Sequence, residues 1–493
     1  MTANPTYPGI YIEEPPSPTK TITGVSTSIT AFIGLAKKGP PNTPTLIHSY
    51  SEYQRKFGGQ WKPSHMSYSV HHYFLNRGEE ALITRVTDQA REGEFTATGQ
   101  DLRFRASSPG TWCKDITIET DTDDLGSADN FNVTVLLTEN GDRHPVEKFY
   151  DLSPEKGNER YAADAINNQS EYIKIPENTS FASPQKAEFN YEEGTAKDDE
   201  TLTKSMLIDA DPEKGINALD EADIFNLLCI PTYTMSEEDL KTVYEYAADY
   251  CEKRRAMLLM DPPHTWDKPD SPITNGLGIY NDNAAIYYPR FIANDPLDNK
   301  PVEYAPSGAI AGAFARTDAT RGIWRAPAGT GTNLSGLVNL KLNLTDEENG
   351  NLNTKGVNCL RTFPNVGTVI WGVRTTNGAD ENASQWKYIP VRRMALHLEE
   401  SLHRGTRWAV FEPNDEPLWA QLRLNIGSFM HELFRQGAFQ GSKPSDAYLV
   451  KCDRETTTPT DVAKGIVNII VGFAPLKPAE FVIIKIQQHA GQE

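Results

Sequence analysis

The clearest pattern of apolar and polar residues lies near the end of the chain, between Trp386 and Phe439. It predicts, in order, a helix, a strand, a turn and a long helix. In the last part, apolar residues recur at three- and four-residue steps, which places them on one stripe of a helix that faces a core. This predicted core stripe consists of Trp419, Leu422, Ile426, Phe429, Met430 and Leu433.

The start of the long helix has favourable capping residues. Asn414 offers a side-chain oxygen that can cap the first turn, and Asp415 and Glu416 follow where the helix dipole favours negative charge. Pro417 falls in the first turn, where its missing N–H matters little. We expect this helix to run to Gly437 and to serve packing.

A second pattern, in the middle of the chain, is typical of alternating strands and helices. Apolar runs at 225–231 and 256–261 predict buried strands, and Ser236 can cap the helix between them. Such a pair of strands is normally parallel, with a right-handed crossover. A third strand over Ala284–Ile292 and a helix of small residues from Ser307 continue the pattern. We therefore predict a multidomain protein of α/β and α+β class.

Both ends of the chain alternate like strands. At the start, the alternation runs from Tyr7 to Glu14 before a proline-rich stretch ends it, and at the other end it runs from Phe481 to Ile486. A single strand must pair with a sheet edge, in its own subunit or in another one. The predicted arm strands contain Tyr7, Ile10, Tyr11, Ile12, Phe481, Val482, Ile483, Ile484 and Ile486.

At 493 residues the chain exceeds what one hydrophobic core usually serves. Its middle contains a polar, acidic, β-rich stretch that includes the run Asp198, Asp199 and Glu200, which we interpret as a solvated module at the surface. The predicted parts are an N-terminal arm (1–20), an α/β domain (21–88 with 206–334), a variable β-rich outer insertion (89–205), a C-terminal α+β domain (335–477) and a C-terminal arm (478–493).

The overall charge narrows the choice of partners. A formal net charge of -19 argues against nonspecific binding to nucleic acid or to an anionic membrane, since both need a basic surface. The five cysteines lie far apart without zinc-ligand spacing, which favours free thiols in a reducing cytosol. The start lacks the features of a signal peptide, and the longest apolar run, Gly465–Ala474, is far shorter than the ~20 residues of a membrane span.

The sequence offers few candidates for chemistry. The small residues at 307–312 could cradle a phosphate, but no Gly-Lys-Ser/Thr motif exists, so close helix packing is favoured. Asp261 ends a predicted parallel strand, where enzymes place functional groups, but a turn-forming role is favoured because no nucleophile or metal ligand lies near it. His397 and His403 are six residues apart, which is the wrong spacing for a helical zinc pair. We expect no catalytic, cofactor-binding or metal-binding residue.

Basic residues gather in the stretch after Trp386, although the chain as a whole is acidic. A local cationic patch can recognise an acidic partner surface, while pairing with the nearby Glu399 and Glu400 is an equally good explanation. The candidate patch contains Arg392, Arg393, Arg404 and Arg407, with Lys387 close by.

Several long segments, in the right order, give the chain a specific resemblance. They are YPGIYIEEPPSPTKTITGVSTSITAFIGLAKKGP, YSEYQRKFGG, APSGAIAGAFARTDATRGIWRAPAG and WKYIPVRRMALHLEESLHRGTRWAVFEPNDEPLW with the helix that follows. In these segments the chain resembles contractile phage tail sheath proteins and their relatives in phage-like contractile injection systems. Only the region from about 89 to 205 lacks matching segments, and the outer insertion of that family varies.

The resemblance implies a mechanical function. In that family the C-terminal region packs toward an inner tube, and terminal arms are exchanged between subunits. Subunits assemble in an extended, metastable state and then repack into a shorter, wider sheath, which drives the tube through a target envelope. The implied partners are further copies in stacked helical rings, the inner tube protein, and baseplate and tail terminator or cap proteins.

The same resemblance implies no nucleic acid, no cofactor and no insertion into a membrane, with assembly in the cytoplasm before the subunit joins a phage tail or phage-like particle. We expect the arginine patch to face the tube or a neighbouring subunit. Two other functions stay open: a minor sheath-like or baseplate adaptor protein of the same particle, and an α/β enzyme that uses residues 225–331.

Overall fold

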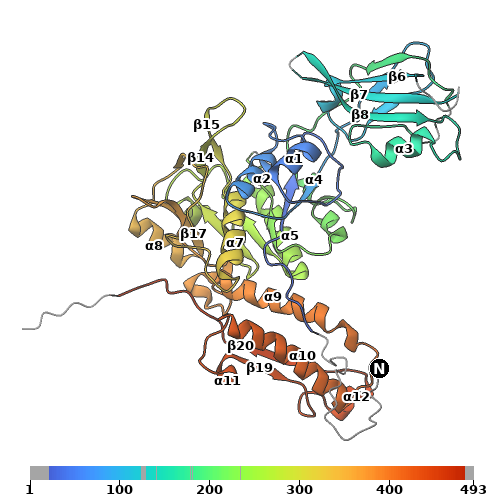
Figure 1. The fold of residues 1–493 in the computed structure, drawn as a ribbon. Coiled ribbons are helices and arrows are strands. Elements are labelled where there is room, and N and C mark those ends of the chain that lie inside the picture. Colours follow the sequence, from blue (N-terminus) through green and yellow to red (C-terminus); the bar gives the residue numbers. More distant parts are fainter. Residues whose placement is uncertain are drawn as a thin grey trace, which may run out of the picture. The chain divides into compact units, whose positions relative to one another are not determined.

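The computed structural model describes residues 21–123, 129–139, 141–177, 179, 181–233 and 235–483 (Figure 1). Their contacts divide them into two compact units. The smaller unit comprises the described residues up to Ser26, together with Arg321–Ala326 and the chain from Pro390 onward, and the larger unit comprises Thr27–Thr320 and Pro327–Ile389. Of the predicted arm residues, Tyr7, Ile10, Tyr11, Ile12, Ile484 and Ile486 lie outside the described residues.

An eight-stranded sheet with the order β18-β17-β13-β12-β11-β1-β3-β2 organises the larger unit. The strands from β17 to β3 are parallel to their neighbours, whereas β18 and β2 pair in antiparallel fashion at the two edges. The strands are β1 (Thr30–Gly34), β2 (Thr45–Ile47), β3 (Ala81–Arg85), β11 (Leu227–Cys229), β12 (Met257–Met260), β13 (Ala284–Tyr288), β17 (Val357–Phe363) and β18 (Gly367–Ile370). The predicted parallel pair is thus confirmed as β11 and β12.

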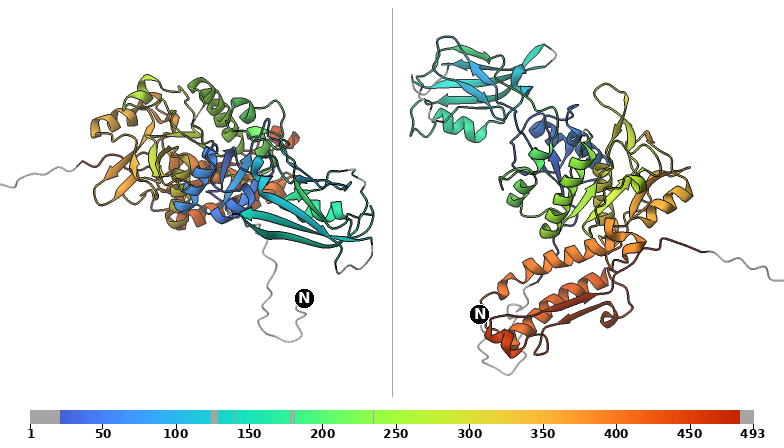
Figure 2. Two further views of the ribbon diagram at one scale, coloured as in Figure 1. Left: turned by 90° about the horizontal axis from the view of Figure 1, so that it is seen from above. Right: turned by 180° about the vertical axis from the view of Figure 1, so that it is seen from behind.

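Helices cover both faces of this sheet, because its strands are apolar on both sides (Figure 1, Figure 2). In β1, for example, Phe32 belongs to one core cluster while Ala31 and Ile33 belong to the other. One face packs α1 (Tyr50–Phe57), α2 (His65–Leu75) and α7 (Ser307–Arg321), and the other packs α4 (Lys204–Leu207), α5 (Glu237–Arg254) and α8 (Asp346–Thr354), with the short α6 (Ser271–Thr274) near its end.

The small residues at the start of α7 allow that helix to touch the backbone of α2. A Cβ atom on Gly308 would lie 2.2 Å from the carbonyl oxygen of Ser69, and one on Gly312 would lie 2.4 Å from that of Tyr73. Only glycine fits at such distances. Close helix packing, which the sequence favoured over a phosphate cradle, is therefore what these glycines provide.

The strand predicted over Ala284–Ile292 is wrong, because two strands in different sheets occupy this stretch. Pro289 lacks the N–H that a ladder needs and interrupts the run after Tyr288. The chain then enters β14 (Phe291–Asn294), which lies between β15 (Pro301–Tyr304) and β16 (Asn339–Leu340) in a three-stranded antiparallel sheet.

The polar stretch after β3 folds as a seven-stranded antiparallel sheet with the order β8-β7-β6-β10-β4-β5-β9. It has its own core, in which Phe95, Phe104 and Phe189 are fully buried, and α3 packs on it (Figure 2). Its elements are β4 (Glu94–Thr96), β5 (Phe104–Ala106), β6 (Ile116–Asp121), β7 (Phe131–Glu139), β8 (Asp142–Leu152), α3 (Ala162–Gln169), β9 (Ile173–Lys174) and β10 (Ala187–Tyr191).

In the smaller unit, α9 (Ile389–Gly405) and α10 (Glu416–Arg435) pack with the two-stranded sheet of β19 (Tyr448–Lys451) and β20 (Ile470–Phe473). The first residue of α9, Ile389, is counted with the larger unit. The short helices of the smaller unit are α11 (Pro444–Ala447) and α12 (Pro459–Ala463). The strand predicted between the two long helices is wrong. A single helical turn, Arg407–Ala409, follows α9 instead, because the amides of Thr406 and Ala409 bond to carbonyls three or four residues earlier.

Three further boundaries differ from the predictions. The cap of α10 is Asp415 rather than Asn414, since the Asn414 side chain bonds to the Trp419 ring N–H instead. The helix ends at Arg435, because Gly437 has a left-handed φ of 79° that a helix does not continue through. Residues 335–389 belong to the larger unit, which differs from the predicted division after residue 334, because β17 and β18 complete its sheet.

Candidate assembly surface

The two-stranded sheet of the smaller unit has an inner and an outer face. Tyr448 pairs with Phe473, and Val450 pairs with Val471, and all four side chains pack toward the core that α10 lines. On the outer face, Leu449 and Ile470 are 55% and 51% exposed. Such a pair of strands is marginally stable on its own in water.

Both long edges of this sheet lack a further strand in the part of the chain that the structure describes, where β19 and β20 pair only with each other. An open edge presents unpaired main-chain N–H and C=O groups to which a further strand can add. The arrangement can therefore accept strands from elsewhere in the chain or from another copy.

The last described residues of the chain suit such an edge chemically. Phe481, Val482 and Ile483 are between 75% and 81% exposed and belong to no strand. Figure 1 shows this segment leaving the body of the smaller unit. Three consecutive apolar residues in water are unfavourable, so they favour burial against a partner.

The predicted core stripe lies on the buried side of α10. Trp419 and Leu422 pack beneath the turn that follows α9, and Ile426, Phe429 and Leu433 pack against α9 and the sheet. Ile22 joins the same core and lies against Gly405 at the end of α9. The smaller unit therefore holds its sheet on a packed helical base.

The four arginines of the candidate patch lie in different settings. Arg392 pairs with Glu399 at 3.3 Å, and the Arg404 Nε pairs with the Glu400 carboxylate at 2.6 Å. Arg393 is only 3% exposed. Arg407 is exposed and forms no ion pair with any described residue. The patch stays a prediction, and Arg407 is the member best placed to meet a partner.

His397 is a packing residue in this setting. Its ring lies against Gly24 and 6.4 Å, between centroids, from the ring of Phe429. Burial lowers the pKa of His397 to about 4, so the ring is neutral at pH 7. The described residues contain no group of histidine, cysteine or acidic side chains that could hold a metal ion.

Asp261 is buried and caps α7. Its carboxylate accepts hydrogen bonds from the amide of Ser307 at 2.8 Å and from the Ser307 hydroxyl at 2.7 Å. Desolvation raises its pKa to about 6, although the nearby Arg290 and these hydrogen bonds oppose the shift. The turn-forming role favoured from the sequence is wrong, because the carboxylate satisfies helix donors that lie 46 residues away.

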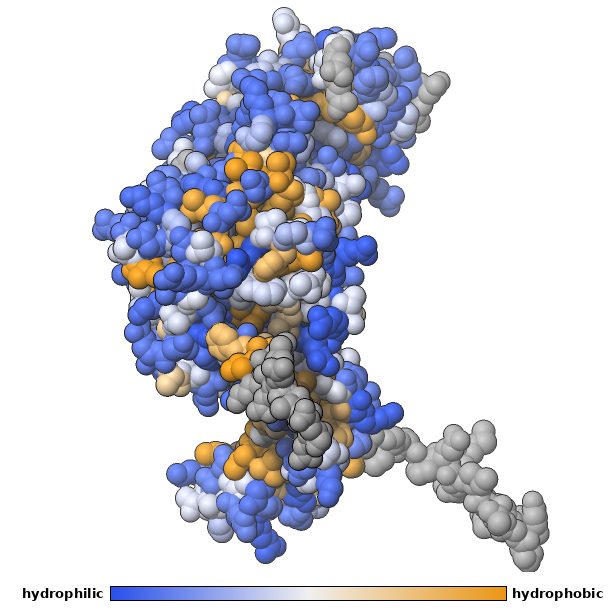
Figure 3. All heavy atoms as spheres, turned by 90° about the vertical axis from the view of Figure 1, so that its left-hand side faces the viewer, coloured by the Kyte–Doolittle hydropathy of each residue, from blue (hydrophilic) through white to orange (hydrophobic). Residues whose placement is uncertain are grey.

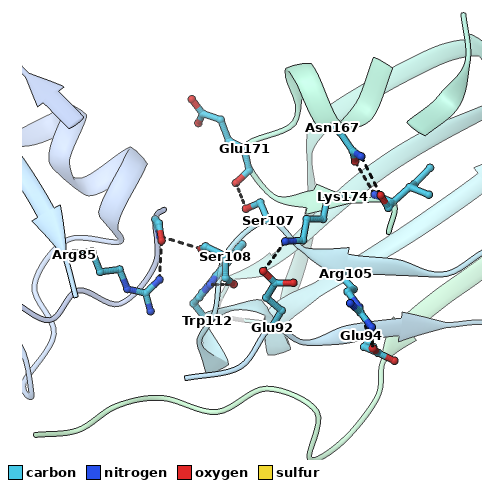
Figure 4. A network of polar contacts seen from close by, with 12 residues as sticks. Arg85, Glu92, Glu94, Arg105, Ser107, Ser108, Trp112, Asn167, Glu171 and Lys174 are labelled. Carbon is cyan, nitrogen blue, oxygen red and sulfur yellow. Dashed lines mark hydrogen bonds and ion pairs between the residues drawn. The ribbon is translucent and has the colours of Figure 1, made fainter. Parts of the chain in front are cut away.

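The insertion is joined to the sheet domain by a buried arginine (Figure 4). Arg85, at the end of β3, donates to the carbonyl oxygens of Gly39 and Pro109, at 2.8 Å each. The Gly39 amide in turn donates to the Ser108 hydroxyl at 3.0 Å. These bonds connect the sheet domain to the insertion, and the arginine is almost fully buried among them.

The acidic run at the end of the insertion also helps to hold this junction. The Asp199 carboxylate accepts from the amides of three consecutive residues, Asp88, Gln89 and Ala90, at 2.9 to 3.2 Å. Asp198 accepts from the amide and the hydroxyl of Thr111. The sequence suggested a solvated run, but Asp199 fastens the entry of the insertion to its exit, and Asp198 bonds to Thr111 inside the insertion.

The five cysteines are buried free thiols. None of the helices in the described part of the chain has the length and hydropathy of a membrane-spanning segment.

Comparison with known proteins gives consistent matches. Residues 209–376 match the family model described as "Phage tail sheath protein central domain", and residues 381–489 match "Phage tail sheath C-terminal domain". A putative prophage major tail sheath protein of Pseudomonas aeruginosa (strain UCBPP-PA14) is 26% identical over 241 residues, which are 46% of this chain and 57% of that protein. The chain spans at most 57% of the length of the curated relatives it matches.

Solved structures show the same fold over nearly the whole chain. A sheath tail protein of Listeria innocua gives a TM-score of 0.64 at 14% identity, over 92% of this chain and 96% of that one. The sheath complex of an extracellular contractile injection system, solved in the contracted state, gives a TM-score of 0.61 at 22% identity, over 99% of both chains.

Proposed function

The chain belongs to the phage tail sheath protein family, and we propose that it is a structural subunit of a helical contractile sheath around an inner tube. The observation that carries this proposal is the two-stranded sheet, whose two edges have no further strand among the described residues, in a chain whose two ends alternate in sequence like strands. A sheet edge and a single strand can form main-chain hydrogen bonds with each other, so an arm of one copy can pair with the sheet edge of another.

Exchange of arms explains how such a sheath stays connected. Main-chain hydrogen bonds between an arm and a neighbour's sheet form a link that does not depend on the larger interfaces around it. Subunits can then rotate and repack from an extended, metastable state into a shorter sheath without losing their neighbours. The free energy comes from the interfaces, so no nucleotide is required.

The proposed partners follow from this role. They are further copies of the chain in a helix of stacked rings, the inner tube protein, and baseplate and tail terminator or cap proteins. The proposed place of action is a phage tail or phage-like injection particle that assembles in the cytoplasm.

Electron microscopy of the purified full-length protein tests the proposal. It should show helical tubes, and deletion of residues 1–16 or 479–493 should abolish them or change their helical register. Tubes of normal register from both truncated proteins would rule out arm exchange, and the absence of tubes from the full-length protein in the presence of its tube protein would count against the sheath itself.

A minor sheath-like protein at the baseplate is the second candidate. It is supported by the anti-feeding prophage baseplate structure, which has a TM-score of 0.60 at 22% identity over 98% of this chain. Counting the copies per particle separates the two roles, since a major sheath protein is present in many rings and an adaptor in one. An enzyme is disfavoured because Asp261 is fully engaged at the start of α7.

A further inference from the structure

The insertion contains a hollow between β8 and α3, two elements that pack against each other (Figure 1). Its volume is about 250 Å³, just below the ~300–1,000 Å³ of pockets for drug-sized ligands. The hollow therefore suits a small ligand, or one ring of a longer molecule. In the polar and aromatic part of its lining, β8 contributes Lys148 and Tyr150, the loop after β8 contributes Glu159 and Arg160, and α3 contributes Gln169.

The wall of the hollow is fixed by hydrogen bonds. A β-bulge in β8 sets Tyr150 and Asp151 opposite the single residue Asn132, and Asp151 has a left-handed φ of 54°. The Asp151 amide donates to the Asn132 Oδ1 at 2.9 Å. Arg160 donates from Nε to the Asp151 carbonyl oxygen at 2.9 Å and from Nη2 to that of Tyr150. Bulges are common beside functional sites, and a wall that is already ordered loses little entropy when a ligand binds.

The polar side chains around the hollow are available to a ligand. No hydrogen bond or ion pair with a residue that the structure describes is formed by the side chains of Lys148, Tyr150, Glu159 and Gln169. The ammonium group donates, the carboxylate accepts, and the amide and the phenol do both. The Tyr150 ring is 58% exposed and adds a flat apolar face beside these groups. A ligand of the hollow must therefore combine several donors and acceptors with an apolar face.

A pyranose ring has this combination. Its hydroxyl groups both donate and accept, and one face of the ring presents C–H groups that can lie on an aromatic side chain. A purely apolar ligand would leave the polar side chains desolvated without partners, which is costly. Figure 3 shows small groups of apolar side chains on one face of the molecule, whereas polar side chains form much of the lining of the hollow. A nucleic acid would meet the Glu159 carboxylate in a chain with a net charge of -19.

We propose that the hollow between β8 and α3 binds one pyranose ring of a saccharide. The ring lies on Tyr150, and its hydroxyl groups bond to Lys148, Glu159 and Gln169. Arg160 is a positioning residue, because its printed bonds hold the main chain of the wall. The inference goes beyond the proposed sheath function and does not depend on assembly, since the whole site lies within the insertion. In a sheath, the site is repeated in every copy, so weak single sites would add up to strong attachment.

Saturation-transfer difference NMR of the full-length protein tests the proposal. The probes are glucose, galactose, mannose, N-acetylglucosamine and glucuronate, each measured separately, with glycerol as a polyol without a ring. At least one pyranose should receive saturation, most strongly at the C–H protons of one ring face, with a dissociation constant on the order of 1 mM. Glycerol should receive none. The absence of transfer to every pyranose, or equal transfer to glycerol, would overturn the proposal.

Substitutions then locate the site. Tyr150→Ala should weaken binding of that pyranose about tenfold, and Gln169→Ala about threefold, with an unchanged melting temperature because both side chains are exposed. Tyr280→Ala is the matched control, since Tyr280 is 61% exposed and lies outside the insertion, and it should bind like wild type. Wild-type binding by Tyr150→Ala, or equal weakening by Tyr280→Ala, would contradict the site. Neither result bears on the proposed sheath, which electron microscopy tests separately.

Discussion

The carboxylate of Asp261 accepts hydrogen bonds from both the main-chain amide and the hydroxyl of Ser307, at 2.8 and 2.7 Å. One buried acid thus connects the end of β12 to the start of α7, two segments far apart in the sequence. Its pKa of about 6 is raised by desolvation above the ordinary value of 3.8.

The first prediction concerns pH. The pKa of Asp261 is higher in the folded chain than in the unfolded one, so the folded chain holds this proton more tightly. The contribution of Asp261 to the free energy of unfolding therefore falls as the pH rises from about 4 through about 6. The expected loss is about 3 kcal/mol of unfolding free energy, and it levels off only at about pH 7, one unit above the folded pKa. In denaturant titrations between pH 4 and pH 8, the free energy of unfolding of wild type should show this fall with pH, and that of Asp261→Asn should not.

A second variant of the same pair gives the control. Ser307→Ala removes a donor that favours the ionised carboxylate, so the pKa of Asp261 should rise further and the loss of stability should extend to higher pH. If all three proteins follow one pH dependence, Asp261 does not titrate in this range.

The contact between α7 and α2 gives a second prediction. Gly308→Ala places a methyl group against a backbone carbonyl that cannot move away cheaply, and should cost about 1–3 kcal/mol of unfolding free energy. Gly350→Ala, inside α8 with open space around it, should instead be stabilising by about 0.5–1 kcal/mol. Thermal unfolding of both variants checks the prediction, and equal effects would mean that α7 and α2 do not touch as described.

The third prediction concerns the junction of the insertion. Arg85→Ala leaves the carbonyl groups of Gly39 and Pro109 without their buried donor. Because hydrogen bonds from a charged group are lost, the substitution should lower the free energy of unfolding by about 2–3 kcal/mol. Limited proteolysis should then cut near residues 88–92. Arg105→Ala, which breaks a partly exposed ion pair with Glu94, should cost below about 1 kcal/mol and leave the cleavage pattern unchanged.

The fourth prediction concerns the basic patch. Arg407→Glu should raise the concentration needed for sheath assembly at least tenfold, about 1.4 kcal/mol, with the melting temperature of the monomer unchanged. Co-sedimentation with the tube protein measures this effect. Arg435→Glu, an exposed position on α10, is the control. Reversal of Arg393 is a poor test, since its burial predicts unfolding rather than a specific loss of assembly.

Sequence patterns predicted the parts of the fold that rest on local periodicity. Three elements show this: the stripe on α10, the small-residue helix α7 and the parallel pair β11 and β12. In each, the spacing of the apolar or small residues in the sequence matches the positions that are buried in the structure. The family was also identifiable from long segments. These features depend on residues close together in the chain, which is why a single sequence reveals them.

What the sequence missed depends on contacts between distant residues. The role of Asp261 needs Ser307, and that of Asp199 needs the amides around Gln89, over 100 residues away. The exposed turn at Phe411 was read as a strand because its residues favour one, but the described residues supply no neighbouring strand. No local pattern contains such information.

The clamp between Asp199 and residues 88–90 places the entry and the exit of the insertion side by side. A module whose two ends meet, and which has its own core, can be exchanged for another without disturbing the strands that precede and follow it. Particles built from this chain could therefore carry foreign domains in place of residues 91–197, with the clamp retained as the grafting point.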